Sequence, residues 1–243
     1  MLGSDETHRE VERTVYTRDY AGYRADPVFE KTVRLVLKSH ISPLKPPPAD
    51  ILDVGCGAGD FLDAAKEMGY SVQGIDVSEA SAEICRSRGF DAVSGDYLSH
   101  DFEKRFDLVT MWDVIEHLRD PGSFFKRTRR ILGPGGIFFG KVPGFGNLSV
   151  ETSRHVPRLA GLLLGAPALV QYLDQRSLSR LAEREGFEIQ WLSPALSAMR
   201  QRQTGGSLKR RVGRTLARAF RRLSGDANLY FVARPRPEGE APA

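Results

Sequence analysis

The stretch that decides the fold reads DVGCGAGD and occupies residues 53–60. A short apolar run at 51–54 leads into it, and residues 61–68 that follow have helical spacing. The glycines at 55, 57 and 59 therefore stand where a strand turns into a helix. At such a turn the backbone can approach a ligand closely, and the first N–H groups of the helix are free to donate to it. The stretch predicts a ligand-binding strand–turn–helix unit.

The same alternation of strand and helix continues along the chain. Further apolar runs lie at 71–75, 91–93, 106–111 and 136–142, and residues 79–88 and 121–132 between them have helical spacing. A helix at 178–184 and strands at 187–192 and 228–233 follow, while residues 28–41 form an earlier helix that ends at Pro43. Alternating strands and helices predict an α/β fold, with a parallel sheet covered by helices on both faces.

The composition is that of an ordinary globular protein. The chain has 243 residues, of which 41% are hydrophobic and 27% are charged, and its net charge is +4. This excludes collagen-like, disordered and coiled-coil proteins. The longest apolar stretch, 159–170, is too short to span a bilayer, and the charged first residues show no secretory signal. We therefore expect a cytoplasmic protein.

The carboxylates around the glycines discriminate between ligands. A dinucleotide-binding loop has glycine where this chain has Asp60, and Asp53 adds a second carboxylate before the first glycine. Two carboxylates would repel a pyrophosphate but suit a ligand that carries a cation. S-adenosyl-L-methionine is such a ligand, with a sulfonium, an amino acid and no phosphate. Asp76 follows the second strand at a distance suited to the ribose hydroxyls.

Five motifs in order carry a family resemblance. They are DVGCGAGD at 53–60, GIDVS at 74–78, GDY at 95–97, FDLV at 106–109 and LGPGG at 132–136. Together they resemble the class I S-adenosylmethionine-dependent methyltransferases. WDVIEH at 112–117 is most similar to the small-molecule branch, which includes the ubiquinone-biosynthesis-type O-methyltransferases. The resemblance implies a Rossmann-like seven-stranded sheet, mostly parallel, whose last strand, 228–233, is antiparallel.

The resemblance also implies which residues contact the cofactor. The methionyl part would contact Asp53, Gly55, Cys56 and Gly57, the ribose and adenine would contact Asp76, Val77, Asp96 and Tyr97, and Trp112 would border the methyl donor. Simpler roles stay open: the glycines form a tight turn, Asp76 caps a helix, and Asp96 belongs to a turn. Cys56 and Cys85 are too few for a disulfide framework or a four-cysteine zinc site, and no acidic or histidine cluster indicates a metal.

His117 is the candidate catalytic residue. A histidine that titrates near neutral pH can take the proton of a hydroxyl or phenol acceptor. Alternatively, His117 only shapes the helix after the fourth strand, because methyl transfer from a sulfonium needs little beyond alignment.

Four regions are expected along the chain. Residues 1–48 form N-terminal cap or lid helices, 49–143 the S-adenosylmethionine-binding core, 144–234 an acceptor lid with a basic helical insert and the final strands, and 235–243 a disordered tail. The tyrosines at 16, 20 and 23 either pack or close over the donor. The acceptor is expected within 144–172, where Gln171-Tyr172-Leu173 replaces the histidine–aromatic pair of small-molecule relatives.

The basic insert leaves the partner open. Residues 207–224 carry seven basic side chains and no acidic one, with apolar residues on one helical face. Such a helix can lie on an anionic membrane, bind nucleic acid, or remain solvated.

The main hypothesis is methyl transfer to an oxygen or nitrogen of a small molecule, hydrophobic or glycan-related. The alternatives are a nucleic-acid methyltransferase, a non-catalytic S-adenosylmethionine-binding regulator and a nicotinamide oxidoreductase. The nucleic-acid methyltransferase is disfavoured because no Asn/Asp-Pro-Pro-aromatic loop follows the fourth strand. The oligomeric state stays open.

Overall fold

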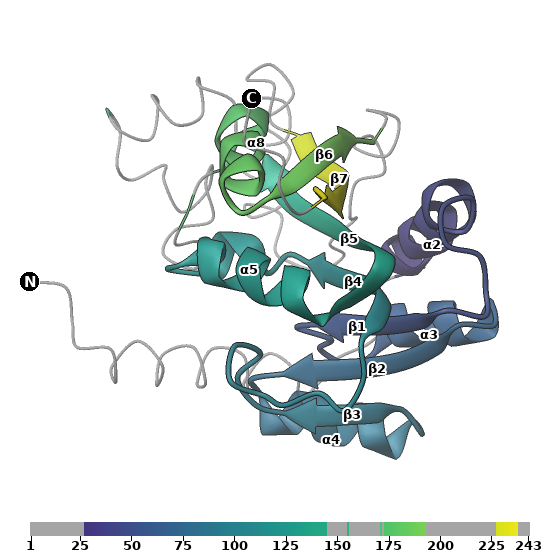
Figure 1. Cartoon of the computed structure of the whole chain (residues 1–243). Helices are drawn as coiled ribbons and strands as arrows, with labels where there is room; N and C mark the ends of the chain where they lie inside the picture. Colours follow the sequence, from purple (N-terminus) through teal and green to yellow (C-terminus); the bar gives the residue numbers. More distant parts are fainter. Residues whose placement is uncertain (1–26, 145–154, 156–170, 172, 193–226, 238–243) are drawn as a thin grey trace, which may run out of the picture. The chain divides into compact units, whose positions relative to one another are not determined.

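The computed structural model describes residues 27–144, 155, 171, 173–192 and 227–237. Seven strands form one sheet in the order β3-β2-β1-β4-β5-β7-β6 (Figure 1). β1 pairs in parallel with β2, and β2 with β3, whereas β7 runs antiparallel to both β5 and β6. The predicted Rossmann-like sheet with an antiparallel last strand is therefore confirmed.

The elements follow the predicted alternation. The strands are β1 (Asp50–Val54), β2 (Ser71–Asp76), β3 (Asp91–Ser94), β4 (Phe106–Trp112), β5 (Leu132–Gly144), β6 (Phe187–Trp191) and β7 (Ala227–Pro235). The helices are α2 (Pro27–Val36), α3 (Asp60–Glu67), α4 (Glu79–Ser87), α5 (Pro121–Ile131) and α8 (Gln175–Arg184). A π-turn, η2 (Leu37–Ile41), continues α2, and a 3-10 turn, η3 (Ile115–His117), follows β4.

Two elements begin three or more residues before their predicted starts. α8 begins at Gln175, a turn earlier than expected, because the Asp174 side chain accepts from the Ser177 amide at 2.7 Å and completes a capping box. β5 begins at Leu132, four residues before the predicted strand at 136–142. Gly135 has a φ of +66° there, and a Cβ on Gly136 would lie 2.9 Å from the Gly133 carbonyl oxygen. Glycine at both positions lets the extended chain bend without ending the strand.

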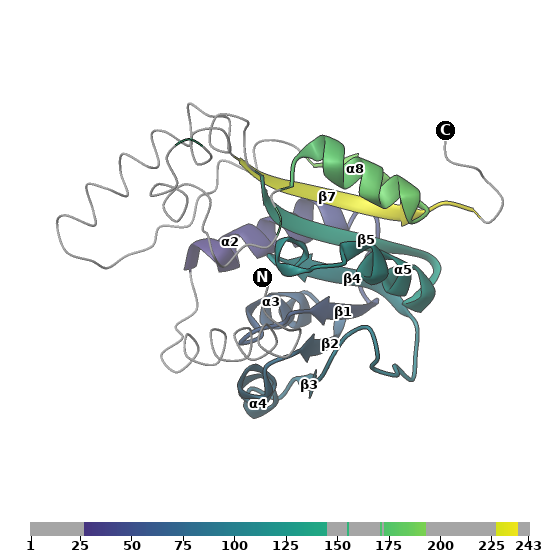
Figure 2. The same ribbon diagram turned by 90° about the vertical axis from the view of Figure 1, so that its left-hand side faces the viewer.

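The chain divides into two compact units. Unit 1 comprises residues 1–110 and 130–136, and unit 2 comprises 111–129 and 137–243. In unit 1, α4 packs against β3 and β2, α3 packs against β2, and α2 packs against α3 (Figure 2). The helical segment predicted at 28–41 fully buries Val33, Val36, Leu37 and Ile41. This packing anchors β1 and β2, the strands that lead into the glycine loop and Asp76.

The core of unit 2 is aromatic. Phe138 makes edge contacts with Phe125 at 5.1 Å, Phe231 at 5.5 Å and Phe187 at 6.1 Å between ring centroids. All four rings are fully buried. Gly140 lies opposite Phe231 in the β5–β7 register, and the ring occupies the space that a side chain at residue 140 would need.

Several predicted features lie outside the described residues. They are the tyrosines at 16, 20 and 23, the apolar stretch 159–170, the basic insert 207–224 and the tail beyond residue 237. Within the part of the chain that the structure describes, no helix has the length and apolar character that crossing a membrane requires.

Candidate functional site

The glycine loop, residues 55–59 between β1 and α3, is held in a conformation that glycine alone adopts freely. Gly55, Gly57 and Gly59 have φ values of +73°, +52° and +86°. The Gly55 amide donates to the Ile75 carbonyl at 2.7 Å, and the Gly59 amide donates to the Cys56 carbonyl at 2.9 Å. Gly55 is exposed while the other four loop residues are buried, so the loop presents its first glycine to solvent.

Asp53 places a buried carboxyl directly before this loop. It is 3% exposed, and Thr110 Oγ1 of β4 donates to its Oδ1 at 2.6 Å. Burial raises the pKa of Asp53 to about 8, with a further increase from the nearby Asp76 carboxylate, while the Thr110 hydrogen bond opposes the shift. A cation that replaces the lost hydration would favour the ionised form, which suits the ammonium of an amino acid ligand.

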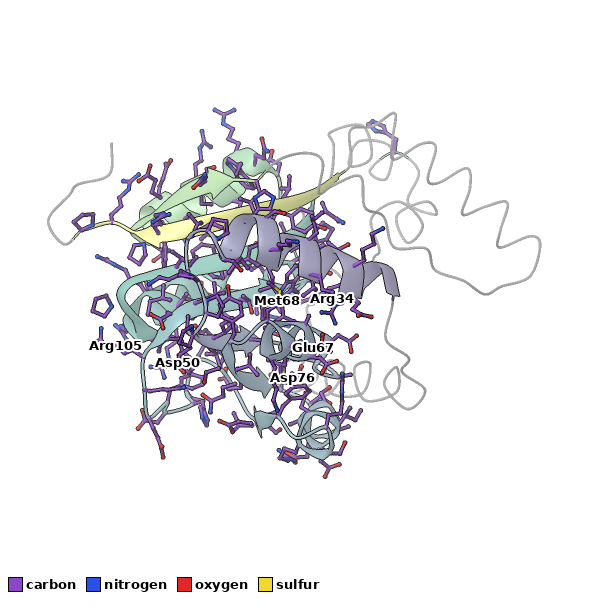
Figure 3. All side chains as sticks on the ribbon, turned by 90° about the vertical axis from the view of Figure 1, so that its right-hand side faces the viewer. Arg34, Asp50, Glu67, Met68, Asp76 and Arg105 are labelled. Atoms are coloured by element: carbon purple, nitrogen blue, oxygen red, sulfur yellow. The ribbon has the colours of Figure 1, made fainter. Side chains whose placement is uncertain are left out.

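Asp76 connects the end of β2 to the glycine loop. Figure 3 labels Asp50 to the left of Asp76, as expected for residues at the start of β1 and at the end of β2. Asp76 Oδ2 accepts from the Gly57 amide and Oδ1 accepts from the Ser78 amide, both at 2.9 Å. Burial raises its pKa, and the two amides oppose the shift. Ser78, not Asp76, is the N-cap of α4. Each Asp76 oxygen keeps a lone pair for a further donor.

The apolar residues beside these carboxyls also fit a nucleoside. Val77, next to Asp76, is 54% exposed, and Leu98, just after β3, is 37% exposed. Exposed branched side chains at the ends of neighbouring strands suit the flat face of a base. A buried carboxyl, a half-buried carboxyl and exposed apolar side chains together fit S-adenosyl-L-methionine. This ligand carries an amino acid, a ribose diol and an adenine, but no phosphate.

Asp60 has a different role from the one inferred from the sequence. Its side chain is 7% exposed, and Arg88 Nη1 lies 3.2 Å from its Oδ1. The pair neutralises the carboxylate, so Asp60 does not add free negative charge to the loop. The argument against a pyrophosphate therefore depends on Asp53 and Asp76.

The residues after β3 form a turn. Asp96 is exposed, its Oδ1 accepts from the Leu98 amide at 2.9 Å, and its carbonyl accepts from the His100 amide at 2.9 Å. Tyr97 is 3% exposed, with its ring centroid 6.2 Å from that of Phe102. Cys56 is buried 3.9 Å from Cys85, sulfur to sulfur. This contact and burial raise the pKa of the Cys56 thiol, which makes it a poor nucleophile.

Trp112 and His117 belong to unit 2. The Trp112 ring is buried, with its centroid 4.7 Å from that of Phe139 and 6.4 Å from that of Tyr230. His117 is half-buried at the end of η3, where its amide donates to the Val114 carbonyl at 3.0 Å. Trp112 is the last residue of β4, although the apolar run 106–111 predicted a strand that ends before it, whereas His117 lies in the helical turn after β4, as predicted.

An ionic cluster that the sequence did not indicate also lies in unit 2. Asp113, with a φ of +54°, is the single non-glycine residue with positive φ among those described, and its carboxylate pairs with Lys141. Glu116 is 1% exposed, and its Oε2 has no hydrogen-bond partner among the described residues. Burial, with the Asp113 carboxylate, raises the pKa of Glu116 well above its usual range. Burial likewise raises the pKa of Tyr230 to about 12.

Sequence reasoning missed two residues beside the glycine loop. Thr110 carries a fully buried hydroxyl in β4, and the available signal was a polar residue between the apolar Val109 and Met111. Arg88, at the end of α4, reaches the loop carbonyl of Ala58. No local pattern marks Arg88, because its partners lie about 30 residues earlier in the chain.

Comparison with known proteins agrees with this geometry. A family model described as a methyltransferase domain matches residues 20–191. A ubiquinone biosynthesis O-methyltransferase of Thiobacillus denitrificans is 29% identical over 155 residues, which are 59% of this chain and 66% of the relative. One of Pseudomonas paraeruginosa is 32% identical over 97 residues, 37% of this chain and 42% of the relative. The match therefore spans less than two thirds of either relative.

Two solved structures share the fold. The phosphoethanolamine N-methyltransferase 2 of Haemonchus contortus, solved with S-adenosylhomocysteine, has a TM-score of 0.64 at 18% identity, covering 98% of this chain and 61% of its own. The magnesium protoporphyrin IX methyltransferase of Synechocystis has a TM-score of 0.61 at 15% identity, covering 96% of this chain and 100% of its own. The family model covers most of the chain and shows that this protein belongs to the methyltransferase-domain family of class I S-adenosylmethionine-dependent methyltransferases, whose fold the two structures share.

Proposed function

We propose that this protein binds S-adenosyl-L-methionine at the glycine loop and transfers its methyl group to an oxygen or nitrogen of a small molecule. The observation that carries the proposal is the buried Asp53 carboxyl, which stands directly before a loop that Asp76 ties to the end of β2. When bound, the cofactor supplies an electrophilic methyl group on a sulfonium sulfur. The ubiquinone O-methyltransferase relatives support a small-molecule acceptor.

The residues of unit 1 would divide the binding work. Asp53 would hold the ammonium of the methionyl part, and Gly55, Cys56 and Gly57 would offer backbone groups beside it. Asp76 would accept from the ribose hydroxyls with its remaining lone pairs, and Val77 would lie against the adenine, with Asp96 and Tyr97 nearby. None of these residues contributes a nucleophile, because their task is to bind and orient the donor.

A residue of unit 2 is proposed to take the proton that the acceptor loses. His117 is half-buried on η3, and its imidazole has ring nitrogens that can accept a proton. Trp112 is proposed to border the methyl donor. The regions 1–48 and 144–234 are proposed to cover the donor and the acceptor, respectively.

Calorimetric titration of the full chain with S-adenosylhomocysteine and with NAD tests the proposal. We expect binding of the first and none of the second. The 2′,3′-dideoxy analogue of S-adenosylhomocysteine should bind at least about tenfold more weakly if Asp76 holds the diol. The ligand is altered instead of Asp76, because an asparagine there would leave the Gly57 or the Ser78 amide without its acceptor. Binding of NAD alone would refute the proposal.

The acceptor class needs a separate experiment. A labelled methyl donor is incubated with the protein and phenols, catechols, amines, glycans or transfer RNA. Label transfer to a small molecule supports the main hypothesis, transfer to RNA supports the nucleic-acid alternative, and binding of S-adenosylhomocysteine without transfer supports a regulator. Cosedimentation with anionic vesicles at moderate salt tests the membrane contact proposed for residues 207–224.

A further inference from the structure

The outer side of the glycine loop is covered by residues at the end of α4, here called the loop support: Cys85, Arg88 and Phe90. Cys85 Sγ donates to the Gly57 carbonyl at 3.2 Å, and Arg88 Nη1 donates to the Ala58 carbonyl. A Cβ on Gly59 would lie 3.0 Å from Cys85 Sγ and 3.3 Å from the Phe90 ring. Two successive loop carbonyls are therefore directed toward the support.

Arg88 is the central member of the support because it has several partners at once. Besides the Ala58 carbonyl, Nη1 lies 3.2 Å from Asp60 Oδ1, and Nη2 lies 3.3 Å from Asp63 Oδ2. The guanidinium carbon is 5.4 Å from the centroid of the Phe90 ring. A planar fork with fixed donors can satisfy these partners together, whereas a single ammonium cannot.

Holding these carbonyls determines where the loop amide points. In a trans peptide the C=O and N–H groups point in opposite directions. Because the Gly57 carbonyl is directed to Cys85, the N–H of Ala58 points to the other side of the loop. The Ala58 carbonyl, held by Arg88, fixes the next peptide plane, whose Gly59 amide is already used by the Cys56 carbonyl. Ala58 thus presents a donor away from α4.

We infer that Arg88 is a positioning residue of the cofactor site: by holding the Ala58 carbonyl it fixes the peptide plane after Ala58 and, together with Cys85 on the plane before it, keeps the Ala58 amide directed toward the methionyl carboxylate of the donor. The inference rests on the proposed function and deepens it. Arg88 does not contact the ligand, so its loss should weaken cofactor binding without removing any group that binds the cofactor directly. A purely structural ion pair between α3 and α4 would instead change only the thermal stability.

The test measures the affinity of the full chain for S-adenosylhomocysteine by calorimetry and the melting temperature of each variant. We expect Arg88→Ala to raise the Kd about tenfold or more and Arg88→Lys to give a smaller increase. The matched control is Arg86→Ala. Arg86 lies in the last turn of the same helix and bonds to Ala92 and Glu79, outside the loop. The Kd of Arg86→Ala for S-adenosylhomocysteine should therefore stay within about twofold of the wild-type value.

A double variant separates positioning from charge balance. Arg88→Ala leaves the buried Asp60 carboxylate without its cation, and Asp60→Asn in the same chain removes that charge. We expect Arg88→Ala/Asp60→Asn to recover the melting temperature but not the affinity. An unchanged Kd in Arg88→Ala, or a Kd restored to within about twofold in the double variant, overturns the inference. If the wild-type protein fails to bind S-adenosylhomocysteine, the proposed function itself is refuted.

Discussion

Replacing Asp53 by asparagine should stabilise the protein while it weakens cofactor binding. Asparagine is neutral at every pH and keeps an oxygen that can accept the Thr110 hydrogen bond. The wild-type carboxyl must be ionised in a buried position or keep its proton. Burial, with a smaller contribution from Asp76, raises its pKa from 3.8 to about 8. Keeping this carboxyl buried therefore lowers the free energy of unfolding at neutral pH. The variant removes this electrostatic penalty, and it also removes the negative charge that a cationic ligand needs.

The sign and size of the effect follow from proton linkage. Between the unfolded pKa and the folded pKa the native state holds more protons than the unfolded state, so the free energy of unfolding falls as pH rises. One pH unit corresponds to about 1.4 kcal/mol, so at pH 7 the accumulated penalty is on the order of 4 kcal/mol. That penalty is absent below the unfolded pKa and fully developed only above pH 8.

Urea unfolding followed by circular dichroism at pH 5, 6 and 7 measures this penalty. The gap between Asp53→Asn and wild type should widen by roughly 1.4 kcal/mol per pH unit. Asp101→Asn, which removes a carboxylate from an exposed position, is the control and should run parallel to wild type. If Asp53→Asn also runs parallel to wild type, the carboxyl is already ionised in the native protein and the desolvation argument fails.

The same carboxyl links binding to pH. A bound ammonium favours ionised Asp53, so the wild-type protein should release a proton on binding S-adenosylhomocysteine at pH 7, and its affinity should rise toward pH 8. Calorimetry in buffers of different ionisation enthalpy counts the proton. Asp53→Asn should bind more weakly and release none from this position. Equal proton release by both proteins would show that the ammonium does not lie beside Asp53.

Three further changes test other parts of the molecule. Thr110→Val removes the donor to Asp53 Oδ1 at 2.6 Å, so the pKa of Asp53 should rise further and urea unfolding should show a loss of about 1–3 kcal/mol; an unchanged midpoint would contradict the hydrogen bond. Gly140→Ala would place a Cβ 2.1 Å from Phe231 Cζ, so we expect a loss of about 3 kcal/mol or more by thermal unfolding, partly recovered in Gly140→Ala/Phe231→Leu; no recovery would place the strain elsewhere. His117→Asn should lower kcat without changing the Kd for S-adenosylhomocysteine, and full turnover would exclude His117 from the mechanism.

Local features of the chain were sufficient to predict the fold and the position of the loop. Gly55, Gly57 and Gly59 occupy positive-φ positions that other residues adopt at a cost, so the turn after β1 can be identified from the local sequence alone. Buried strands appear as continuous apolar runs, and the alternation with helices predicts the sheet. Boundaries were less accurate where side chains decide them, as at the Asp174 cap of α8.

The sequence by itself therefore determined the features that depend on neighbouring residues. These are the strand–turn–helix unit and the positions of the carboxyls at the ends of β1 and β2. Only the tertiary structure decided how these carboxyls behave, because burial and distant partners set their charge. Thr110 reaches Asp53 from 57 residues away, and Arg88 reaches Asp60 from 28 residues away. The pairing with Arg88 removed Asp60 from the acidic site that the sequence suggested, while burial left Asp53 as its centre. Hydration and pairing depend on which strands and helices pack together, and no local pattern along the chain records that.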